Sequence, residues 1–152
     1  MIIKAIPFFM FSCMIIAKPL YGDKQLTLML ETHCHMIDSF PKLLGIHIYE
    51  NKEGRVLQLD IDSQDTNNNA IKAMEAMSMI GQYSKSPFYK FILIEHYPEP
   101  KIPAGFESSA DCAINFFVKN KISESKWMKD CLSNSIIQRK IENWSELSKI
   151  MP

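Results

Sequence analysis

Glycine, net charge and catalytic motifs are all scarce in this chain of 152 residues. The 5 glycines lie too far apart for the phosphate-binding loops G-x-G-x-x-G and G-x-x-x-x-G-K-[ST], which excludes nucleotide enzymes of those two kinds. The motifs G-x-S-x-G, H-E-x-x-H and C-x-x-C are also missing, so no motif indicates a reaction. The 17 basic residues balance the 17 acidic ones, which argues against a protein that binds nucleic acid by charge. With 47% hydrophobic residues, the composition predicts one folded domain.

The first 22 residues have the pattern of a secretory signal peptide. Lys4 gives a positive start, Ala5 to Ala17 is an uncharged apolar run, and Lys18-Pro19 breaks it. A membrane-spanning helix needs roughly 20 apolar residues, so the run is short for a permanent anchor. We therefore expect cleavage near Gly22 and a periplasmic protein. The alternative is an uncleaved anchor in the inner membrane, with the domain facing the periplasm.

Export changes what the cysteines of the mature chain indicate. Cys34, Cys112 and Cys131 would lie in an oxidising compartment, where disulfides form and persist. Three cysteines allow at most one internal disulfide and leave one thiol over. Their separations in the sequence do not select the pair, and three buried thiols are the alternative.

Hydrophobic periodicity divides the mature chain into helices and strands. It predicts a helix over 23–43, a hairpin of strands around 46–49 and 57–61, a helix from Asp65 or Thr66 to Gly81, a strand over 88–96, a proline-rich loop over 97–109, a strand over 110–118, and a helical tail from Ser123. The predicted fold class is α+β, with the order αββαββ. We expect a ferredoxin-like, four-stranded antiparallel sheet over 23–121, two helices on one face, and a tail over 122–152 that packs on the domain or extends from it.

Several short segments resemble one family of envelope proteins. They are Phe40-Pro41 with Gly45-Ile46, Gly54-Arg55-Val56-Leu57, Asn69-Ala70 with Met74 and Met77, Ser86-Pro87-Phe88, and Phe91 to Ile94. In this order they resemble the periplasmic αββαββ domain of inner-membrane assembly proteins from type IV pilus and type II secretion machines. The chain differs from that family because it has no coiled-coil spacer before the domain and adds a tail with two tryptophans. Both differences fit a smaller accessory protein of the kind encoded with type IVb pili, such as the toxin-coregulated and bundle-forming pili.

The resemblance implies a non-enzymatic scaffold in pilus biogenesis or related secretion, with no cofactor, metal, small-molecule substrate or nucleic acid. Its partners would be other assembly proteins of the envelope, and a homodimer through an exposed sheet edge stays open. The alternative is a periplasmic immunity or inhibitor protein that binds a toxin or an envelope hydrolase. A third class, an orphan cysteine or metal enzyme, would require a reactive thiol or a bound metal in the purified protein.

The histidines and cysteines that could carry chemistry are not spaced to form one metal site or one catalytic site. His33 and His35 flank Cys34, but successive helical residues point about 100° apart, so the two imidazoles face nearly opposite sides and are unsuited to one ion. No histidine is placed by the sequence as a base for a cysteine nucleophile. The better candidates are contact residues, namely Trp127, Ile141 and Trp144 in the tail, and Tyr97 and Pro100 in the proline-rich loop. For the tryptophans, the alternative is docking onto the open face of the sheet.

Overall fold

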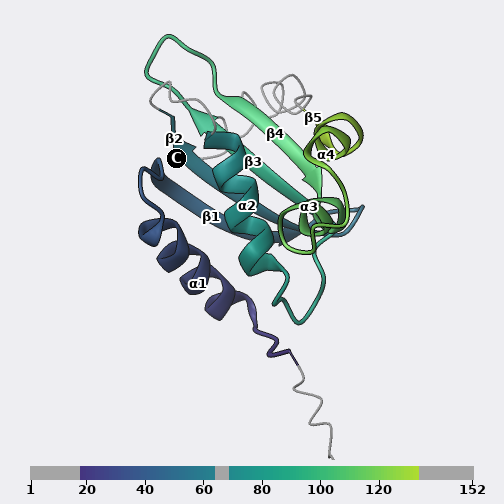
Figure 1. Cartoon of the computed structure of the whole chain (residues 1–152). Helices are drawn as coiled ribbons and strands as arrows, with labels where there is room; N and C mark the ends of the chain where they lie inside the picture. The colour runs from purple at the N-terminus through teal and green to yellow at the C-terminus, as the bar shows by residue number, and fades with distance from the viewer. Residues whose placement is uncertain (1–17, 64–68, 134–152) are drawn as a thin grey trace, which may run out of the picture.

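The structure, a computed structural model, describes residues 18–63 and 69–133, which form helices and one sheet (Figure 1). In chain order the elements are α1 (Asp23–Met36), β1 (Lys42–Glu50), β2 (Arg55–Asp62), α2 (Asn69–Gly81), β3 (Lys90–His96), β4 (Ala104–Ser109), α3 (Ala110–Phe117), α4 (Glu124–Asp130) and β5 (Leu132–Ser133). Helices α1, α2 and α3 cover one face of the sheet in Figure 1. The α+β class predicted from the sequence is confirmed.

The predicted hairpin is confirmed, with β1 and β2 joined by a tight turn. The side chain of Asn51 accepts hydrogen bonds from the backbone N–H groups of Glu53 (2.9 Å) and Gly54 (3.0 Å). Gly54 has a φ of 144°, and an added Cβ would lie 2.9 Å from the Cβ of Tyr89. A side chain at this position would therefore be strained by the backbone conformation and would clash with Tyr89.

The sheet is mixed rather than antiparallel. Its strands lie in chain order, β1-β2-β3-β4-β5, and β2 runs parallel to β3 while the other neighbours are antiparallel. The physical reason is that α2 crosses over one face of the sheet and returns the chain to the end where β2 began. The prediction of a four-stranded antiparallel sheet was therefore wrong, because the described sheet has five strands and one parallel pairing, and the ferredoxin-like description is compatible with the fold only at a coarse level.

The predicted strand over 110–118 is a helix, and the preceding loop contains a strand. Residues 104–109 form β4, and α3 then begins at Ala110 because Ser109 caps it by accepting a hydrogen bond from the backbone N–H of Cys112 (3.4 Å). Ala110 and Ala113, three residues apart, are the buried positions of α3. The segment that alternates like a strand therefore also places Ala110 and Ala113 on one face of a helix.

The first helix is shorter than predicted. It ends at Met36, and Leu43, expected in the helix, belongs to β1. Ser39 has a positive φ of 60°, and Pro41 disfavours a helical conformation in the residue before it. For the second helix, the predicted caps Asp65 and Thr66 lie outside the described residues, while its end at Gly81 is confirmed.

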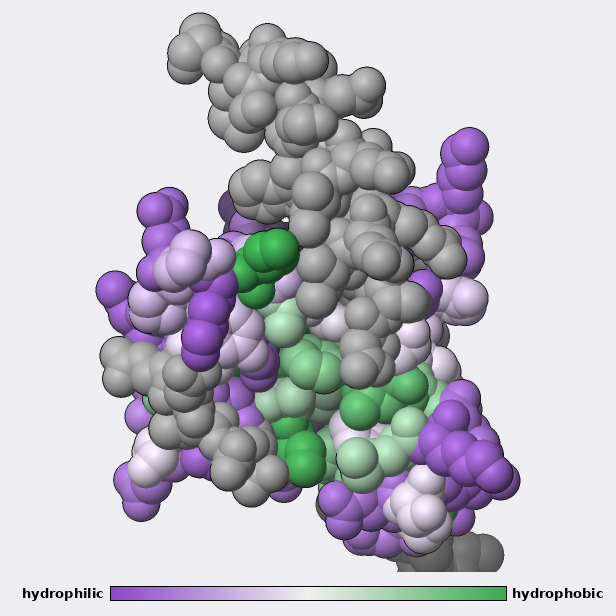
Figure 2. All heavy atoms as spheres, turned by 90° about the horizontal axis from the view of Figure 1, so that it is seen from above, coloured by the Kyte–Doolittle hydropathy of each residue, from purple (hydrophilic) through white to green (hydrophobic). Residues whose placement is uncertain are grey.

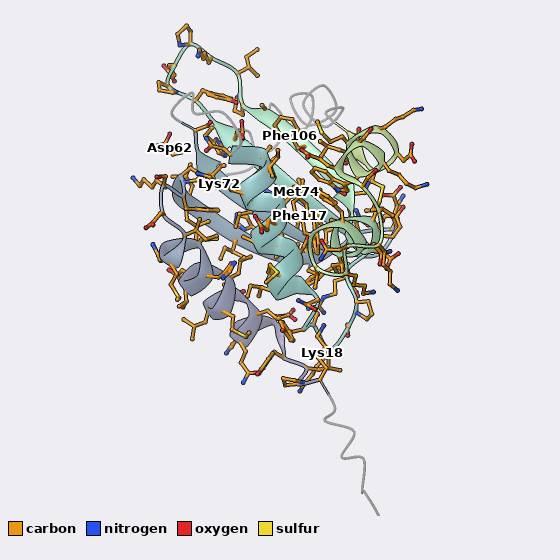
Figure 3. All side chains as sticks on the ribbon, in the orientation of Figure 1. Lys18, Asp62, Lys72, Met74, Phe106 and Phe117 are labelled. Carbon is orange, nitrogen blue, oxygen red and sulfur yellow. A yellow bond between two sulfur atoms is a disulfide. The ribbon has the colours of Figure 1, made fainter. Side chains whose placement is uncertain are left out.

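The main core lies between the helices and the sheet. Figure 3 labels Met74 of α2, Phe106 of β4 and Phe117 of α3, and all three belong to this core or pack against it. Seen from above, apolar side chains gather in the middle of this end of the molecule and polar ones flank them (Figure 2). The methionines of α2 mostly fill this core, since Met74 and Met77 are fully buried and only Met79 is exposed.

Residues 122–133 pack onto the same body. Ser123 caps α4 by accepting a hydrogen bond from the N–H of Lys126 (3.2 Å), and β5 pairs with β4 at the edge of the sheet. A disulfide joins Cys112 of α3 to Cys131, with their Cα atoms 6.3 Å apart. The structure thus selects one pair from the three cysteines and leaves Cys34 as a buried thiol.

Candidate interaction surfaces

Trp127 is a core residue and not a surface contact, which corrects its prediction as part of an interface. Its side chain is 0% exposed, and its indole N–H donates a hydrogen bond to the hydroxyl of Ser108 (3.0 Å). The ring stacks on Phe116 at a centroid distance of 5.3 Å and meets Phe117 edge-on at 4.9 Å. Trp127 therefore fastens α4 to the domain. The other two predicted tail residues, Ile141 and Trp144, lie outside the described residues.

The proline-rich loop between β3 and β4 extends beyond the ends of the strands (Figure 1). Tyr97 is half-buried at its start and donates a hydrogen bond to the carboxylate of Glu95, while Lys101 lies over the Tyr97 ring at 5.6 Å. Pro100, which follows a cis peptide bond, is exposed, and so is Ile102. Of the two loop residues predicted as contacts, Pro100 is therefore exposed and Tyr97 is half-buried.

The edge of the sheet at β1 forms a surface that sequence reasoning missed. A groove runs between this strand and α1, lined by Leu43, Leu44, Gly45, Ile46, Thr27, Glu31 and His35. Leu44 lies at a β-bulge in the pairing with β2, and its side chain is 48% exposed. Alternating hydrophobic residues predicted the strand, but no signal in the sequence indicated that it would lie at the edge.

The backbone of β1 offers outward hydrogen-bonding groups at the edge of the sheet, and one of the residues that carry them, Ile46, also lines the groove. In the turn, Asn51 and Gly54 exchange both of their backbone hydrogen bonds, at 3.0 and 3.3 Å. Hydrogen-bonded and non-hydrogen-bonded pairs alternate along an antiparallel ladder, so the N–H and C=O groups of Glu50, Ile48 and Ile46 point away from β2. Outward-pointing groups of this kind are the template to which another strand can add.

The face of the sheet opposite the helices carries a second, smaller apolar cluster. Val56 and Ile92 are buried there, and Tyr49 and Ile94 pack against them. Polar contacts lie around the cluster: the Lys90 amino group is 3.4 Å from the carboxylate of Glu53 and 3.5 Å from that of Glu107, and His96 Nε2 is 3.3 Å from the carboxylate of Asp60.

The pKa values of Lys90 and Tyr49, two residues on this opposite face, are both raised by their surroundings. Burial alone lowers the pKa of Lys90, but the carboxylates of Glu107 and Glu53 outweigh it, so the pKa is raised overall. The pKa of Tyr49 is raised by burial first and by the charge of Asp60 second, and its hydroxyl donates a hydrogen bond to Gln58 (3.1 Å). Both groups therefore hold their protons in the neutral range.

The cluster around Cys34 has the geometry of a core thiol. Cys34 is buried against the domain, and burial raises its pKa to about 12. His33 is half-buried and His35 is exposed. In the part of the chain that the structure describes, no group of three His, Cys, Asp or Glu side chains is arranged to hold a metal ion. Cys34 is therefore protonated at neutral pH and has little nucleophilic character.

The described molecule is an α+β domain with a disulfide, an edge strand beside a groove, and an exposed proline-rich loop. Among residues 18–63 and 69–133, each helix is too short or too polar to cross a bilayer. In comparisons with family models, with curated proteins and with solved structures, no match to this chain was found.

Proposed function

We propose that this chain is a non-enzymatic envelope protein that acts by protein–protein contact in the biogenesis of type IV pili or in related secretion. The observation that carries the proposal is the edge of β1 beside the α1 groove, where outward backbone groups and the exposed side chain of Leu44 lie together. Exposed strand edges are recognition sites for extended segments of other proteins. Other pilus or secretion assembly proteins are the partners we propose.

The partner would add an extended strand to β1. Its backbone would pair with the outward groups of Ile46, Ile48 and Glu50, and its side chains would enter the groove beside Leu44 and Thr27. A second copy of this chain fits less well, because α1 packs along β1 (Figure 1). Paired strands lie about 4.8 Å apart, whereas packed helices need about 8–10 Å, so two copies joined at β1 would crowd their α1 helices.

The periplasmic location is part of the proposal. The disulfide between Cys112 and Cys131 supports it, because such bonds persist mainly in oxidising compartments. The order helix, strand, strand, helix, strand, strand supports the narrower assignment to pilus or secretion machines, since that order is the basis of the resemblance. An immunity or inhibitor role stays the alternative, and the identity of the captured partner distinguishes the two.

The test is affinity capture from envelope extracts with the full chain tagged at its C-terminus. Leu44→Glu places a charge in the groove, and Ile102→Glu makes the same chemical change in the exposed proline-rich loop. We expect Leu44→Glu to reduce recovery of pilus or secretion components about tenfold, since a charge buried without a partner costs at least about 1.4 kcal/mol. Ile102→Glu should leave recovery unchanged.

Two other results of this capture, and one assay of the purified protein, would change the conclusion. Recovery that survives Leu44→Glu but not Ile102→Glu would move the contact to the loop. Recovery of a single toxin or hydrolase would favour the inhibitor role. Turnover of a substrate by the purified protein would refute the non-enzymatic proposal.

A further inference from the structure

Helix α1 carries two methionines and a histidine on one side, and the proposed function uses none of them. Met29, His33 and Met36 follow one another at spacings of four and three residues within the helix. Side chains at these spacings are neighbours on a helix, with Cβ atoms about 5–6 Å apart. The groove residues Thr27 and Glu31 point to the other side of α1, because successive residues turn by about 100°. The three side chains therefore form a Met–His stripe on the side of α1 away from the β1 edge.

The Met–His stripe is accessible and does not fill the core. Met36 is 77% exposed, and Met29 and His33 are half-buried. Neither Met29 nor Met36 packs against the apolar clusters that the described residues form, whereas Met74 and Met77 of α2 are fully buried. No hydrogen bond or ion pair joins the His33 ring to another residue of the described parts of the chain. The two thioethers and the imidazole can therefore bind a ligand from solvent.

We propose that the Met–His stripe binds a soft monovalent metal ion of the Cu(I) type. Thioether sulfur is a soft ligand that selects Cu(I), and imidazole also suits copper, whereas Mg²⁺ and Ca²⁺ prefer oxygen ligands. His33 and Met36 lie in the last turn of α1, where the negative end of the helix dipole favours a cation. Both the donor atoms and their place in the helix therefore favour a soft cation.

His33 is the ligand that every binding mode of the stripe shares. Bonds from a closed-shell ion such as Zn²⁺ to nitrogen and sulfur are about 2.0–2.3 Å long, so two donor atoms on one ion lie within about 5 Å of each other. Neighbours with Cβ atoms about 5–6 Å apart reach this separation by side-chain rotation alone. Met29 and Met36 are about 10.5 Å apart along the helix, which is too far for both to bind one ion closely. The ion therefore pairs His33 with one thioether at a time, and the flexible methionine side chains allow either pairing.

Two neighbouring groups that also bind metals are placed differently. Cys34 is buried, and burial raises its pKa to about 12, so its thiol is protonated at neutral pH. His35 lines the groove beside β1, on the other side of the helix from the Met–His stripe. This inference is therefore independent of the proposed function, because the stripe and the groove lie on different sides of α1.

The test is a titration of the full chain with Ag(I), followed by NMR of ¹³C-labelled methionine methyl groups. Ag(I) is soft and monovalent like Cu(I) and needs no reductant, so the disulfide stays intact during the experiment. We expect the methyl signals of Met29 and Met36, assigned with Met29→Leu and Met36→Leu, to shift. The signals of Met74, which is buried, and of Met128, which is 48% exposed on α4, should stay in place. Zn²⁺ at the same concentration should shift none of them.

Substitutions test the shared role of His33. His33→Ala should abolish the shifts of both methionines, and so should Met29→Leu and Met36→Leu combined. Each methionine variant alone should weaken binding only about twofold, the loss expected when one of two equal pairings is removed. Cys34→Ala and His35→Ala should leave binding unchanged.

Four results would overturn the inference. The absence of a shift at Met29 and Met36 in an excess of Ag(I) would show that the stripe binds no soft ion. Shifts that survive His33→Ala would place the ion elsewhere, and loss of binding in Cys34→Ala would assign it to the thiol. Equal shifts with Zn²⁺ would show that the thioethers do not select the ion.

Discussion

Replacing Trp127 by alanine should destabilise the whole domain, although the residue lies in a helix of only 7 residues. A helix this short is not stable alone in water, so its position depends on the contacts of Trp127 with Phe116, Phe117 and Ser108. Deleting a fully buried tryptophan typically costs about 3–5 kcal/mol, a large part of the roughly 5–15 kcal/mol that stabilises a domain. Urea denaturation followed by circular dichroism measures the loss.

Matched variants separate this effect from a general loss of helix. Met128→Ala changes the next residue of α4, which is 48% exposed, and should cost less than about 0.5 kcal/mol. If Trp127→Ala does not fold, Trp127→Phe and Ser108→Ala, alone and combined, still measure the hydrogen bond, whose coupling should be about 0.5–1.5 kcal/mol. A loss below about 1 kcal/mol for Trp127→Ala, or a coupling near zero, would refute the docking of α4 described above.

Three further predictions follow from other parts of the fold. Replacing both Cys112 and Cys131 by serine should lower the free energy of unfolding by about 3 kcal/mol in urea titrations, because the disulfide closes a loop across a separation of 19 residues; an unchanged midpoint would contradict this. Burial raises the pKa of Cys34 to about 12 from 9.0, so the unfolded chain loses this proton first as pH rises. Stability should therefore fall by up to about 1.4 kcal/mol per pH unit above pH 9, and Cys34→Ala should remove that part of the slope. The proposed export with cleavage near Gly22 predicts that the protein recovered from envelope extracts has an intact mass starting close to Gly22, whereas a mass that includes Met1 would support the uncleaved anchor.

Local patterns in the sequence were enough to predict the elements whose apolar residues fit either the period of a strand or that of a helix, but not both. The hairpin followed from apolar alternation on both sides of a polar turn that ends at Gly54. Helix α2 followed from Ala73, Met74 and Met77, which recur at helical spacing and are all buried. In both cases the information lies within a few residues, so no distant contact was needed to interpret it.

The prediction failed for a segment whose residues fit both the alternation of a strand and the period of a helix. Residues 110–117 alternate like a strand, yet Ala110 and Ala113 also lie on one helical face. The cap at Ser109 and the aromatic contacts of Phe116 and Phe117 with Trp127 favour the helix. The cap was a local signal that could have been found, whereas the aromatic contacts join residues from separate elements.

The sequence by itself determined the α+β class, the hairpin, the second helix and the scarcity of catalytic motifs. Only the tertiary structure decided that β2 and β3 run parallel, that Cys112 pairs with Cys131, that Trp127 is buried, and that β1 lies at an edge beside α1. The reason is physical. Side-chain periodicity records which face of an element is apolar, but strand order, disulfide pairing and surface grooves depend on which elements become neighbours, and that depends on how the whole chain packs.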